Sequence, residues 1–428
     1  MMAATLLAST AVQARDLVIH AGRLIDGSSE AVREKVSILV HDERITAIAP
    51  GFVTPAGANV IDLADKTVLP GLIDTHDHIT AGYHPGDPIR TAVTRTPFQD
   101  AIEATAFARA TLLAGFTAVR DCGGETAAVV ALKREIASGA VPGPRLWVAG
   151  SPLGPTGGHG DSANGLIPQI AELPHQADNL VDSADDARRT VRRLHREGVD
   201  LIKIMPSGGV MSIGDNPDWQ LMTDDEIKAV VDTAHALGMR VAAHAHGKQA
   251  IDHAIALGVD SIEHGSFGDA GTYKLFKQHG TYLVPTLLVG ERVYQRAKTR
   301  PEDLNPSTAE KALRIAPVLR RNLHDAYAAG VKIAFGTDTF GLSRHGENAQ
   351  EFALMVAAGM RPIDAIRSAT GVAAELLGSQ DVGRVEAGRY ADIVAVDGDP
   401  LQDVRLLEKI PFVMKGGVVV KQGGQSAL

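Results

Sequence analysis

From about residue 71 onward, hydrophobic positions follow two alternating patterns along the chain. Short apolar runs of strand length are separated by amphipathic stretches in which apolar residues recur with the period of a helix. Eight runs predict strands, over Leu72–His76, Thr117–Asp121, Arg145–Ala149, Leu201–Met205, Val241–His244, Ser261–His264, Tyr282–Thr286 and Ile333–Asp338. Helices are predicted between them, as over Ala101–Leu113, Ala184–Arg196, Asp224–Leu237 and Ala309–Ala329. Strands that are apolar on both faces and alternate with helices indicate a parallel sheet in an α/β fold.

Eight strand–helix units closed on themselves form a (β/α)₈ TIM barrel, and an open doubly wound sheet is the alternative. The polar residues favour the barrel, because they lie at the carboxyl ends of many different strands, where barrel active sites are built. We therefore predict a catalytic barrel over residues 71–379, whose last helix runs over Pro362–Leu377.

Both ends of the chain carry a β pattern instead. Strand-like runs bounded by turn residues occur at Asp16–His20, Val36–Val40 and Arg44–Ile48, and again at Arg389–Asp397, Pro411–Lys415 and Gly417–Val420. We predict that residues 16–70 and 380–428 pair to form one small β-sandwich domain beside the barrel.

Composition narrows the range of partners. Hydrophobic residues make up 45% and charged residues 22% of the 428 positions, which is ordinary for a soluble globular protein with a large core. The net charge is −9 and no basic run occurs, so nucleic acid and anionic membranes are poor candidates. No apolar run reaches the length of about 18 residues that a membrane span needs. Cys122 is the only cysteine, which excludes an internal disulfide and leaves the compartment open.

The first fifteen residues form a separate segment. They are small and apolar and end in a small-x-small pattern before Arg15, which resembles the end of a secretory signal peptide, although a positive n-region is missing. An N-terminal extension of the folded chain is the alternative. A signal remnant would imply a periplasmic or secreted protein, and otherwise a cytoplasmic one is expected.

The first barrel strand places two histidines two residues apart. In an extended strand, side chains at i and i+2 point to the same face, so His76 and His78 project side by side as a pair of metal ligands must. Chance spacing on an exposed strand is the alternative. The metal interpretation gains weight because further candidate ligands, Lys203, His244, His264 and Asp338, each close another apolar run.

Lys203 lies within an apolar strand, where a lone ammonium is costly to bury. It could reach solvent from the strand end, or it could be neutral and reactive. A neutral amine can add CO₂ to become a carbamate, whose two anionic oxygens can bridge two metals. Asp338 could cap a following helix, or it could bind metal and act as a general base. Nitrogen and oxygen ligands without thiolates suit zinc, manganese or another first-row divalent ion, and we expect two ions, with Zn²⁺ as the favoured metal.

Together these motifs resemble the amidohydrolase superfamily over nearly the whole chain. They are Pro70–His78, Lys203, His244-Ala245-His246, Glu263-His264-Gly265, Gly336-Thr337-Asp338 and Gly388–Val394. The resemblance implies that His76, His78 and Asp338 hold one metal and that His244 and His264 hold the other, with carboxylated Lys203 and a hydroxide bridging them. Asp77 departs from the family, which usually carries an apolar residue between the first two histidines.

Two further motifs are similar to the imidazolonepropionase-like branch of this superfamily, Gly154–Gly160 and His345-Gly346-Glu347-Asn348. That branch includes metal-dependent carboxypeptidases acting on Xaa-Pro or Xaa-Arg dipeptides, and bacterial amidohydrolases that release phenylalanine from ochratoxin A. The resemblance is closest to the ochratoxin-degrading enzymes. Relatives assemble into homo-oligomers, often of eight subunits, and a homo-oligomer is expected here.

The resemblance leads to an expected reaction, the hydrolysis of an amide bond to a C-terminal amino acid. A metal-bridging hydroxide would attack the carbonyl, and Asp338 would act first as general base and then as general acid. His246 and His159 are candidates to bind the oxyanion, with a core role and a structural loop role as their respective alternatives. The candidate substrate contacts also include His345, Tyr294, Arg292 and Arg296, and for the last three a position on the surface of a helix is the favoured alternative.

Two other functions remain open from the sequence. The same scaffold could hydrolyse or deaminate cyclic amides or heterocycles. A non-catalytic assembly protein would require lost ligands, whereas every expected ligand is present.

Overall fold

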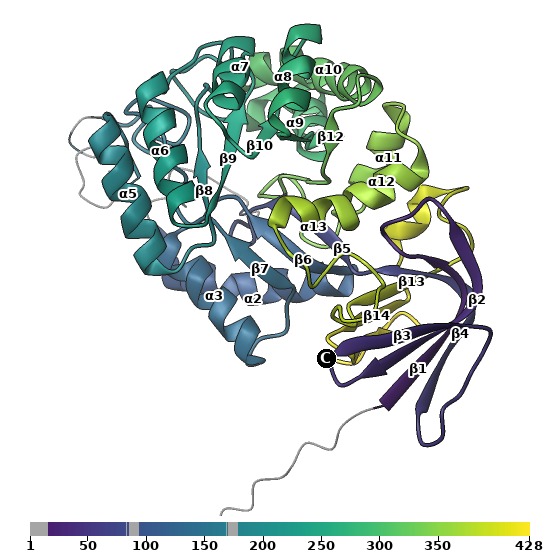
Figure 1. The fold of residues 1–428 in the computed structure, drawn as a ribbon. Coiled ribbons are helices and arrows are strands. Elements are labelled where there is room, and N and C mark those ends of the chain that lie inside the picture. Colours follow the sequence, from purple (N-terminus) through teal and green to yellow (C-terminus); the bar gives the residue numbers. More distant parts are fainter. Residues whose placement is uncertain (1–15, 83, 85–93, 168, 170–178) are drawn as a thin grey trace, which may run out of the picture.

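A computed structural model of the protein describes residues 16–82, 84, 94–167, 169 and 179–428. The predicted N-terminal segment, residues 1–15, lies outside the described part. Within that part, the chain folds into a helix-wrapped set of parallel strands and a second sheet built from both ends of the sequence (Figure 1).

The predicted strands of the α/β region are all present. The described residues contain eight strands in this region: β5 (Leu72–Asp77), β6 (Phe116–Asp121), β7 (Arg145–Val148), β8 (Leu201–Ile204), β9 (Arg240–Ala245), β10 (Ser261–His264), β11 (Tyr282–Val284) and β12 (Lys332–Ile333). They pair in parallel as two sheets, β5-β6-β7 and β8-β9-β10-β11-β12. Every described side chain of β5, β6, β8 and β10 is buried, as strands covered on both faces require.

Single bridges rather than full ladders join the two sheets. Leu153, beyond β7, pairs with Ile204 of β8, and Asp77 of β5 pairs with Thr339, beyond β12. At the second of these junctions, between β5 and the segment after β12, Thr75 N–H also donates to the Phe335 carbonyl at 2.9 Å. The strands therefore follow the order of a barrel, although two of its eight junctions are made by irregular segments.

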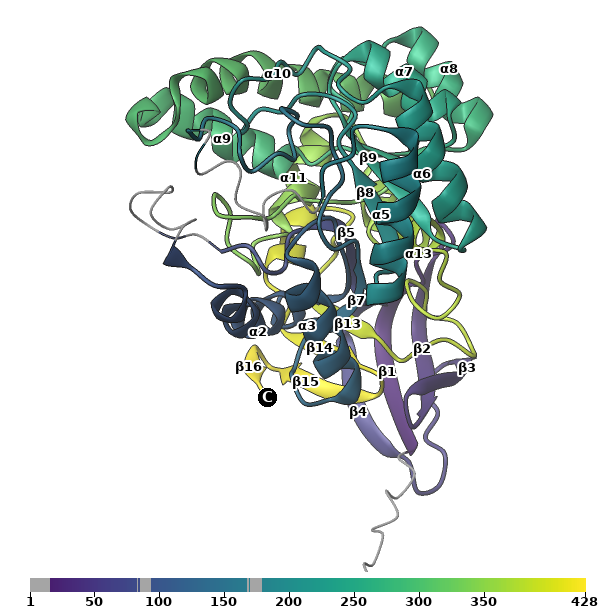
Figure 2. The ribbon, with the colours of Figure 1, turned by 90° about the vertical axis from the view of Figure 1, so that its left-hand side faces the viewer.

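Helices pack around these strands and alternate with them along the chain (Figure 2). Those described are α2 (Pro97–Leu113), α3 (Thr126–Ser138), α5 (Ala184–Glu197), α6 (Asp224–Ala236), α7 (Lys248–Ala256), α8 (Ala270–His279), α9 (Leu287–Thr299), α10 (Pro306–Ala328), α11 (Gln350–Ala357), α12 (Pro362–Ser368) and α13 (Gly371–Leu377). Two short 3₁₀ segments, η2 (Pro301–Asp303) and η3 (Val404–Glu408), complete the helical elements that are described.

The prediction of one helix over Pro362–Leu377 was wrong, because the chain breaks between α12 and α13. The break frees two backbone carbonyls to bond β5 and the segment after β12. The carbonyl of Ser368 accepts from Phe335 N–H at 2.9 Å, and the carbonyl of Ala369 accepts from Ile73 N–H at 2.8 Å. A continuous helix would use these carbonyls internally, so the interruption supplies hydrogen bonds that the strands lack.

The ends of two predicted strands also differ from the structure. The strands expected over Tyr282–Thr286 and Ile333–Asp338 end early, at Val284 and Ile333. Thr286 and Asp338 adopt left-handed backbone with φ of 48° and 54°, which a strand cannot accommodate.

The terminal sheet joins the two ends of the chain, as predicted. Its strands are β1 (Asp16–Ile25), β2 (Val32–His41), β3 (Arg44–Pro50), β4 (Asn59–Pro70), β13 (Ile393–Asp397), β14 (Phe412–Lys415), β15 (Val418–Gln422) and β16 (Gln425–Ser426). They form one hydrogen-bonded sheet in the order β16-β15-β14-β13-β4-β1-β2-β3. The long strand β4 was not predicted, and it is the element that pairs with β1 on one side and with β13 on the other.

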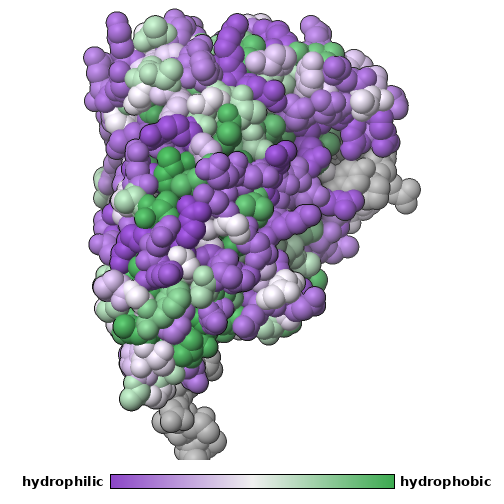
Figure 3. Space-filling model, turned by 90° about the vertical axis from the view of Figure 1, so that its right-hand side faces the viewer, coloured by the Kyte–Doolittle hydropathy of each residue, from purple (hydrophilic) through white to green (hydrophobic). Residues whose placement is uncertain are grey.

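This sheet has its own hydrophobic core, which includes Ile38, Val68, Ile393 and Phe412. The helices and barrel strands share a larger one. On the side of the molecule shown in Figure 3, hydrophilic and hydrophobic residues are interspersed. No helix in the described part of the chain combines the length and the apolar character that crossing a bilayer requires. The expected homo-oligomer stays a prediction, since one chain is described.

Arg145 connects the barrel to the terminal sheet. Its Nε donates to the Asp392 carboxylate at 2.9 Å, and its guanidinium stacks on the Tyr390 ring at 3.6 Å. The Asp392 side chain is only 3% exposed, so losing its cation leaves a buried carboxylate without a counter-charge.

We predict that Arg145→Met lowers the free energy of unfolding by about 3 kcal/mol, measured by urea denaturation. Arg188→Met is the matched control, since Arg188 pairs with an exposed carboxylate, Asp185. The control should shift stability by less than about 0.5 kcal/mol. Equal losses in the two variants would contradict the role assigned to Arg145.

Candidate active site

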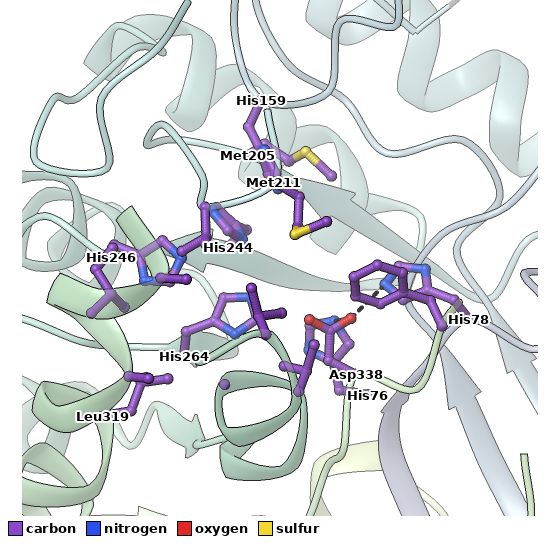
Figure 4. A pocket seen from close by; sticks show the side chains of 18 of the residues that line it. His76, His78, His159, Met205, Met211, His244, His246, His264, Leu319 and Asp338 are labelled. Carbon is purple, nitrogen blue, oxygen red and sulfur yellow. Dashed lines mark ion pairs between the residues drawn. The ribbon is translucent and has the colours of Figure 1, made fainter. Parts of the chain in front are cut away.

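The first cluster of candidate ligands lies where β5 meets the segment after β12. Asp338 Oδ1 is 3.0 Å from His78 Nε2 and 3.5 Å from His76 Nε2 (Figure 4). The opposite ring nitrogens are held from behind. His76 Nδ1 lies 2.7 Å from Glu263 Oε2, and His78 Nδ1 donates to the Gly123 carbonyl at 2.7 Å. The strand register and these anchors therefore direct both Nε2 atoms toward Asp338.

The second cluster comes from the ends of β9 and β10. One ligand atom each from His244, His246 and His264 lies within 4.8 Å of the other two. His264 Nδ1 lies 2.6 Å from Thr286 Oγ1, which leaves its Nε2 for a ligand. His244 is anchored in the opposite sense, because its Nε2 lies 3.2 Å from the Gly208 carbonyl and Nδ1 is left available.

Lys203 lies between the two clusters. Its side chain is 2% exposed, and its Nζ is 3.5 Å from His76 Nε2. Among the described residues, no carboxylate lies within ion-pair distance of this nitrogen. The His76 ring is 5.3 Å from the His264 ring between centroids, and His264 is 4.7 Å from His244. All six predicted ligands, His76, His78, Lys203, His244, His264 and Asp338, thus line one cavity.

The electrostatics of the site suit cation binding. Burial lowers the pKa of His76 to about 4 and that of His246 to about 3, and it holds the pKa values of His244 and His264 well below the usual range. These imidazoles are therefore neutral near pH 7 and keep a lone pair for a metal. Burial opposes ionisation of Asp338, but His76 and His78 hold the pKa of Asp338 well below its usual value.

Three buried residues at the site adopt a backbone conformation that is rare outside glycine. His264, Thr286 and Asp338 have φ values of 69°, 48° and 54°. Such conformations cost on the order of 1–3 kcal/mol each and persist only where the surroundings enforce them. At Asp338 the enforcing contact is its N–H, which donates to the His76 carbonyl at 2.6 Å. The strain therefore accompanies the placement of two ligands and of the residue that anchors one of them.

The cavity has a volume of about 300 Å³ and two chemically different halves (Figure 4). The candidate ligands, with His159 and His246, form the polar half. The other half is lined by apolar side chains from the loop after β8, from α9 and α10, and from the segment after β12: Met205, Val210, Met211, Val289, Val293, Ile315, Leu319 and Phe340. Lys203 is the only lysine or arginine among the described residues that line it.

Four of the predicted substrate contacts do not reach this cavity. Arg292 donates to Glu347 at 2.9 Å, Arg296 pairs with Asp303, and Tyr294 lies under Lys298 at 5.2 Å from its ring centroid. The structure fits the alternative for these three residues, a position on the outer side of α9, because Val289 and Val293 of the same helix line the wall instead. His345 is buried behind the site, where its Nε2 donates to the Ala81 carbonyl at 2.9 Å.

A layer of buried polar residues behind the ligands was not predicted. Glu263 joins His76 to Arg120, whose Nη2 donates to Glu263 Oε1 at 2.8 Å. Burial acts to raise the pKa of Glu263, but the Arg120 charge and the hydrogen bond with His76 hold it well below its usual range. Asp74 accepts from Thr337 Oγ1 at 2.6 Å and from Asn348 Nδ2 at 2.8 Å. The sequence contains one indication of this layer, because the charged residues Asp74, Arg120 and Glu263 lie within otherwise apolar strands.

Comparison with known proteins places this geometry in a family. The model of the amidohydrolase family matches residues 67–421. This chain belongs to the amidohydrolase family. The family confirms that the chain is a hydrolase acting on carbon–nitrogen bonds, and it is generally metal-dependent, in keeping with the clusters of His and Asp that can hold metal.

Individual relatives cover nearly the whole chain. An ochratoxinase of Aspergillus niger is 30% identical over 434 aligned positions, which span 96% of this chain and 88% of the relative. The crystal structure of a Xaa-Pro dipeptidase with methionine in its active site has a TM-score of 0.90 at 38% identity, covering 95% of this chain and 100% of the other.

A third relative is a prolidase crystallised with N-methylphosphonate-L-proline, with a TM-score of 0.86 at 32% identity, covering 95% of this chain and 100% of the other. The predicted superfamily branch and the predicted barrel with a terminal β domain are confirmed by these similarities.

Glu263 is predicted to tune metal affinity through His76. Carboxylates behind a ligating histidine fix its orientation and raise its basicity, and their loss typically costs 10- to 100-fold in affinity. We expect Glu263→Gln to weaken metal binding by about 10-fold or more, measured by competition with a chelator. Glu197→Gln, in a half-buried helical ion pair with Arg193 far from His76 in the sequence, is the control. Unchanged affinity in Glu263→Gln would show that this contact does not act on the metal.

The metal-free protein should lose stability at high pH. Burial acts to lower the pKa of His78, but the hydrogen bond and charge of Asp338 raise it to about 9, above the value of about 6.5 in an unfolded chain. This contribution is fully present below pH 6.5 and is lost as the pH rises through 9, which corresponds to about 3 kcal/mol. Thermal unfolding of chelator-treated protein at pH 6 and pH 9 measures it. In Asp338→Asn the pH-dependent difference should shrink, and an unaltered difference would contradict the assignment.

Proposed function

We propose that this chain is a binuclear metal-dependent amidase of the carboxypeptidase type. Its reaction is hydrolysis of the amide bond to the C-terminal amino acid of N-acyl amino acids or dipeptides, with conversion of ochratoxin A to ochratoxin α and phenylalanine among its activities. The observation that carries the proposal is the convergence of two ligand clusters on one half of a cavity whose other half is apolar. The ochratoxinase and dipeptidase relatives support the same reaction class.

The residues present suit two divalent cations. Neutral imidazoles and one carboxylate are nitrogen and oxygen ligands of the kind that zinc prefers, and no described thiolate competes, since the Cys122 pKa is raised to about 12 by burial. Lys203 is buried between the clusters without a described carboxylate partner, which is unfavourable for an ammonium and is relieved if the amine becomes an anionic carbamate. We therefore assign two ions, as zinc, and carboxylation of Lys203.

When bound, such ions supply a water molecule that is deprotonated near neutral pH and polarise a carbonyl oxygen. The protein contributes the proton transfers and the placement of the substrate. Asp338 has its carboxylate at the mouth of the first cluster, where it can take a proton from the attacking water and deliver it to the leaving nitrogen. His246 lines the same cavity, where it can hydrogen-bond the carbonyl oxygen as negative charge develops.

The apolar half of the cavity favours a large hydrophobic group next to the scissile bond. Burying such a group contributes roughly 25 cal/mol per Å² of apolar surface, whereas a charged side chain there would lie among aliphatic residues without a partner. This composition fits N-acyl phenylalanine and N-acyl leucine, and it disfavours N-acyl aspartate and N-acyl lysine.

A substrate panel tests the proposal directly. We expect release of phenylalanine from ochratoxin A and from N-acyl phenylalanine by the zinc-loaded enzyme, with a kcat/KM at least about 10-fold higher than for N-acyl aspartate. Hydantoins and lactams test the cyclic-amide alternative in the same assay. Turnover of cyclic amides without release of amino acids would replace the proposed function by that alternative.

Lys203→Ala should abolish activity while the fold is retained. Lys203 would help to hold both ions, and we expect kcat to fall by more than about 1,000-fold without it, since losing one member of a group that acts as a unit costs nearly the whole effect. Circular dichroism and the metal content measured by mass spectrometry accompany the rate. Lys248→Ala, on a surface ion pair, is the control and should keep full activity. Full activity in Lys203→Ala would exclude the carbamate bridge.

A further inference from the structure

His159 is held differently from the other imidazoles of the cavity. It lies in the glycine-rich loop after β7, and its ring stacks on that of His244 at 4.4 Å between centroids. Its Nδ1 is 2.8 Å from Ser212 Oγ. Its Nε2 makes no hydrogen bond within the described residues, so this atom is left for the cavity that His159 lines.

The hydroxyl of Ser212 is directed away from His159. Ser212 Oγ lies 2.7 and 2.6 Å from the two carboxylate oxygens of Asp215. Asp215 also accepts from Gly209 N–H at 3.1 Å and from Lys311 Nζ at 3.1 Å, so it acts as an acceptor toward every partner, as an ionised carboxylate must. Because a hydroxyl has one proton, and the alternative acceptor, the Gly209 carbonyl, is farther away at 3.4 Å, Ser212 donates to Asp215.

The direction of this chain of hydrogen bonds determines the tautomer of His159. With its proton committed to Asp215, Ser212 Oγ can only accept from His159, so Nδ1 carries a proton. In the neutral ring Nε2 then has a lone pair and no proton. His159 consequently faces the cavity as a hydrogen-bond acceptor, which differs from the expectation that it donates to the oxyanion.

The hydrogen-bonded series Lys311–Asp215–Ser212–His159, here called the relay, is anchored on two elements, the loop after β8 and helix α10. The side chains of Asp215 and Lys311 are 1% and 10% exposed, and Lys311, from α10, also donates to the Ser212 carbonyl at 2.7 Å. Gly209 packs against the His159 ring so closely that a Cβ there would come within 2.2 Å of the ring. The loop that carries Ser212 and Asp215 is thus folded around His159 and fixes its position.

We propose that Ser212, Asp215 and Lys311 are positioning residues that hold His159 as an acceptor for the N–H of the scissile amide. This proposal rests on the proposed amidase function. A secondary amide, as in N-acyl phenylalanine, has this N–H, whereas the tertiary amide of an N-acyl proline lacks it. The relay therefore selects secondary amides over prolyl amides.

The test compares N-benzoyl-L-phenylalanine with N-benzoyl-L-proline in the zinc-loaded enzyme. Ser212→Ala and Asp215→Asn should lower kcat/KM for the phenylalanine substrate by about 10-fold or more and change it by less than about threefold for the proline substrate. Ser212→Thr, which keeps the hydroxyl, should restore most of the preference. Arg314→Met is the matched control, since Arg314 ties the same helix to the same loop through an exposed ion pair with Asp218.

Metal content is measured in every variant, so that an effect on the ligands is separated from an effect on His159. The positioning role would be contradicted if kcat/KM fell equally for both substrates, if the ratio of the two kcat/KM values stayed unchanged, or if Ser212→Ala lost metal. Those results leave the amidase function standing, because the wild-type enzyme still releases amino acid. Absence of hydrolysis of any acyl amino acid by the wild type would instead refute the proposed function.

Discussion

The backbone seam between β5 and residues 335–339 is the contact on which both the barrel and its site depend. Thr75 donates to Phe335, both Thr337 and Asp338 donate to the His76 carbonyl, and His78 donates to Thr339. These bonds close the gap that the short strand β12 leaves. The same bonds bring Asp338 against the histidines of β5, although the two segments are about 260 positions apart in sequence. The hydrogen bonds that join the two ends of the barrel thus also bring the first ligand cluster together.

Burial of the five histidines on β5, β9 and β10 and directly after them is possible because each has a hydrogen-bond partner behind it. Unpaired polar groups in a protein interior cost several kcal/mol, and each of these imidazoles is bonded through the ring nitrogen that faces away from the cavity. Arg120 and Glu263 are both buried, and they compensate each other while Glu263 orients His76. The layer behind the ligands is therefore as much a condition for folding as for metal binding.

The architecture could be predicted from the sequence where the hydrophobic positions follow a regular pattern. The eight apolar runs were sufficient to predict the barrel strands. The polar residues at their ends, beginning with the pair His76 and His78, were sufficient to predict which side chains converge on one cavity. The strand β4 escaped prediction because Asp62, Asp65 and Lys66 interrupt its apolar pattern, and only pairing with β1 and β13 makes it a strand. The break after Ser368 could not be foreseen, since its cause lies in distant strands that need its carbonyls.

Substrate contacts were the least predictable part of the site, for a geometric reason. In α9 the residues that face the cavity and those that face away from it are only one or two positions apart. Arg292 and Val293 are adjacent in the sequence, yet only Val293 lines the cavity, and Arg292 pairs with Glu347 instead. Only the packing of α9 against α10 decides which face is presented. Over the described residues, the cavity wall is therefore made of apolar side chains, imidazoles, Asp338 and Lys203, and no arginine lines it. Selectivity in such a site has to come from the shape of the apolar wall and from the direction in which each imidazole donates or accepts. That direction is fixed from behind each ring, by a carboxylate for His76, by backbone carbonyls for His78 and His244, and by hydroxyl groups for the others.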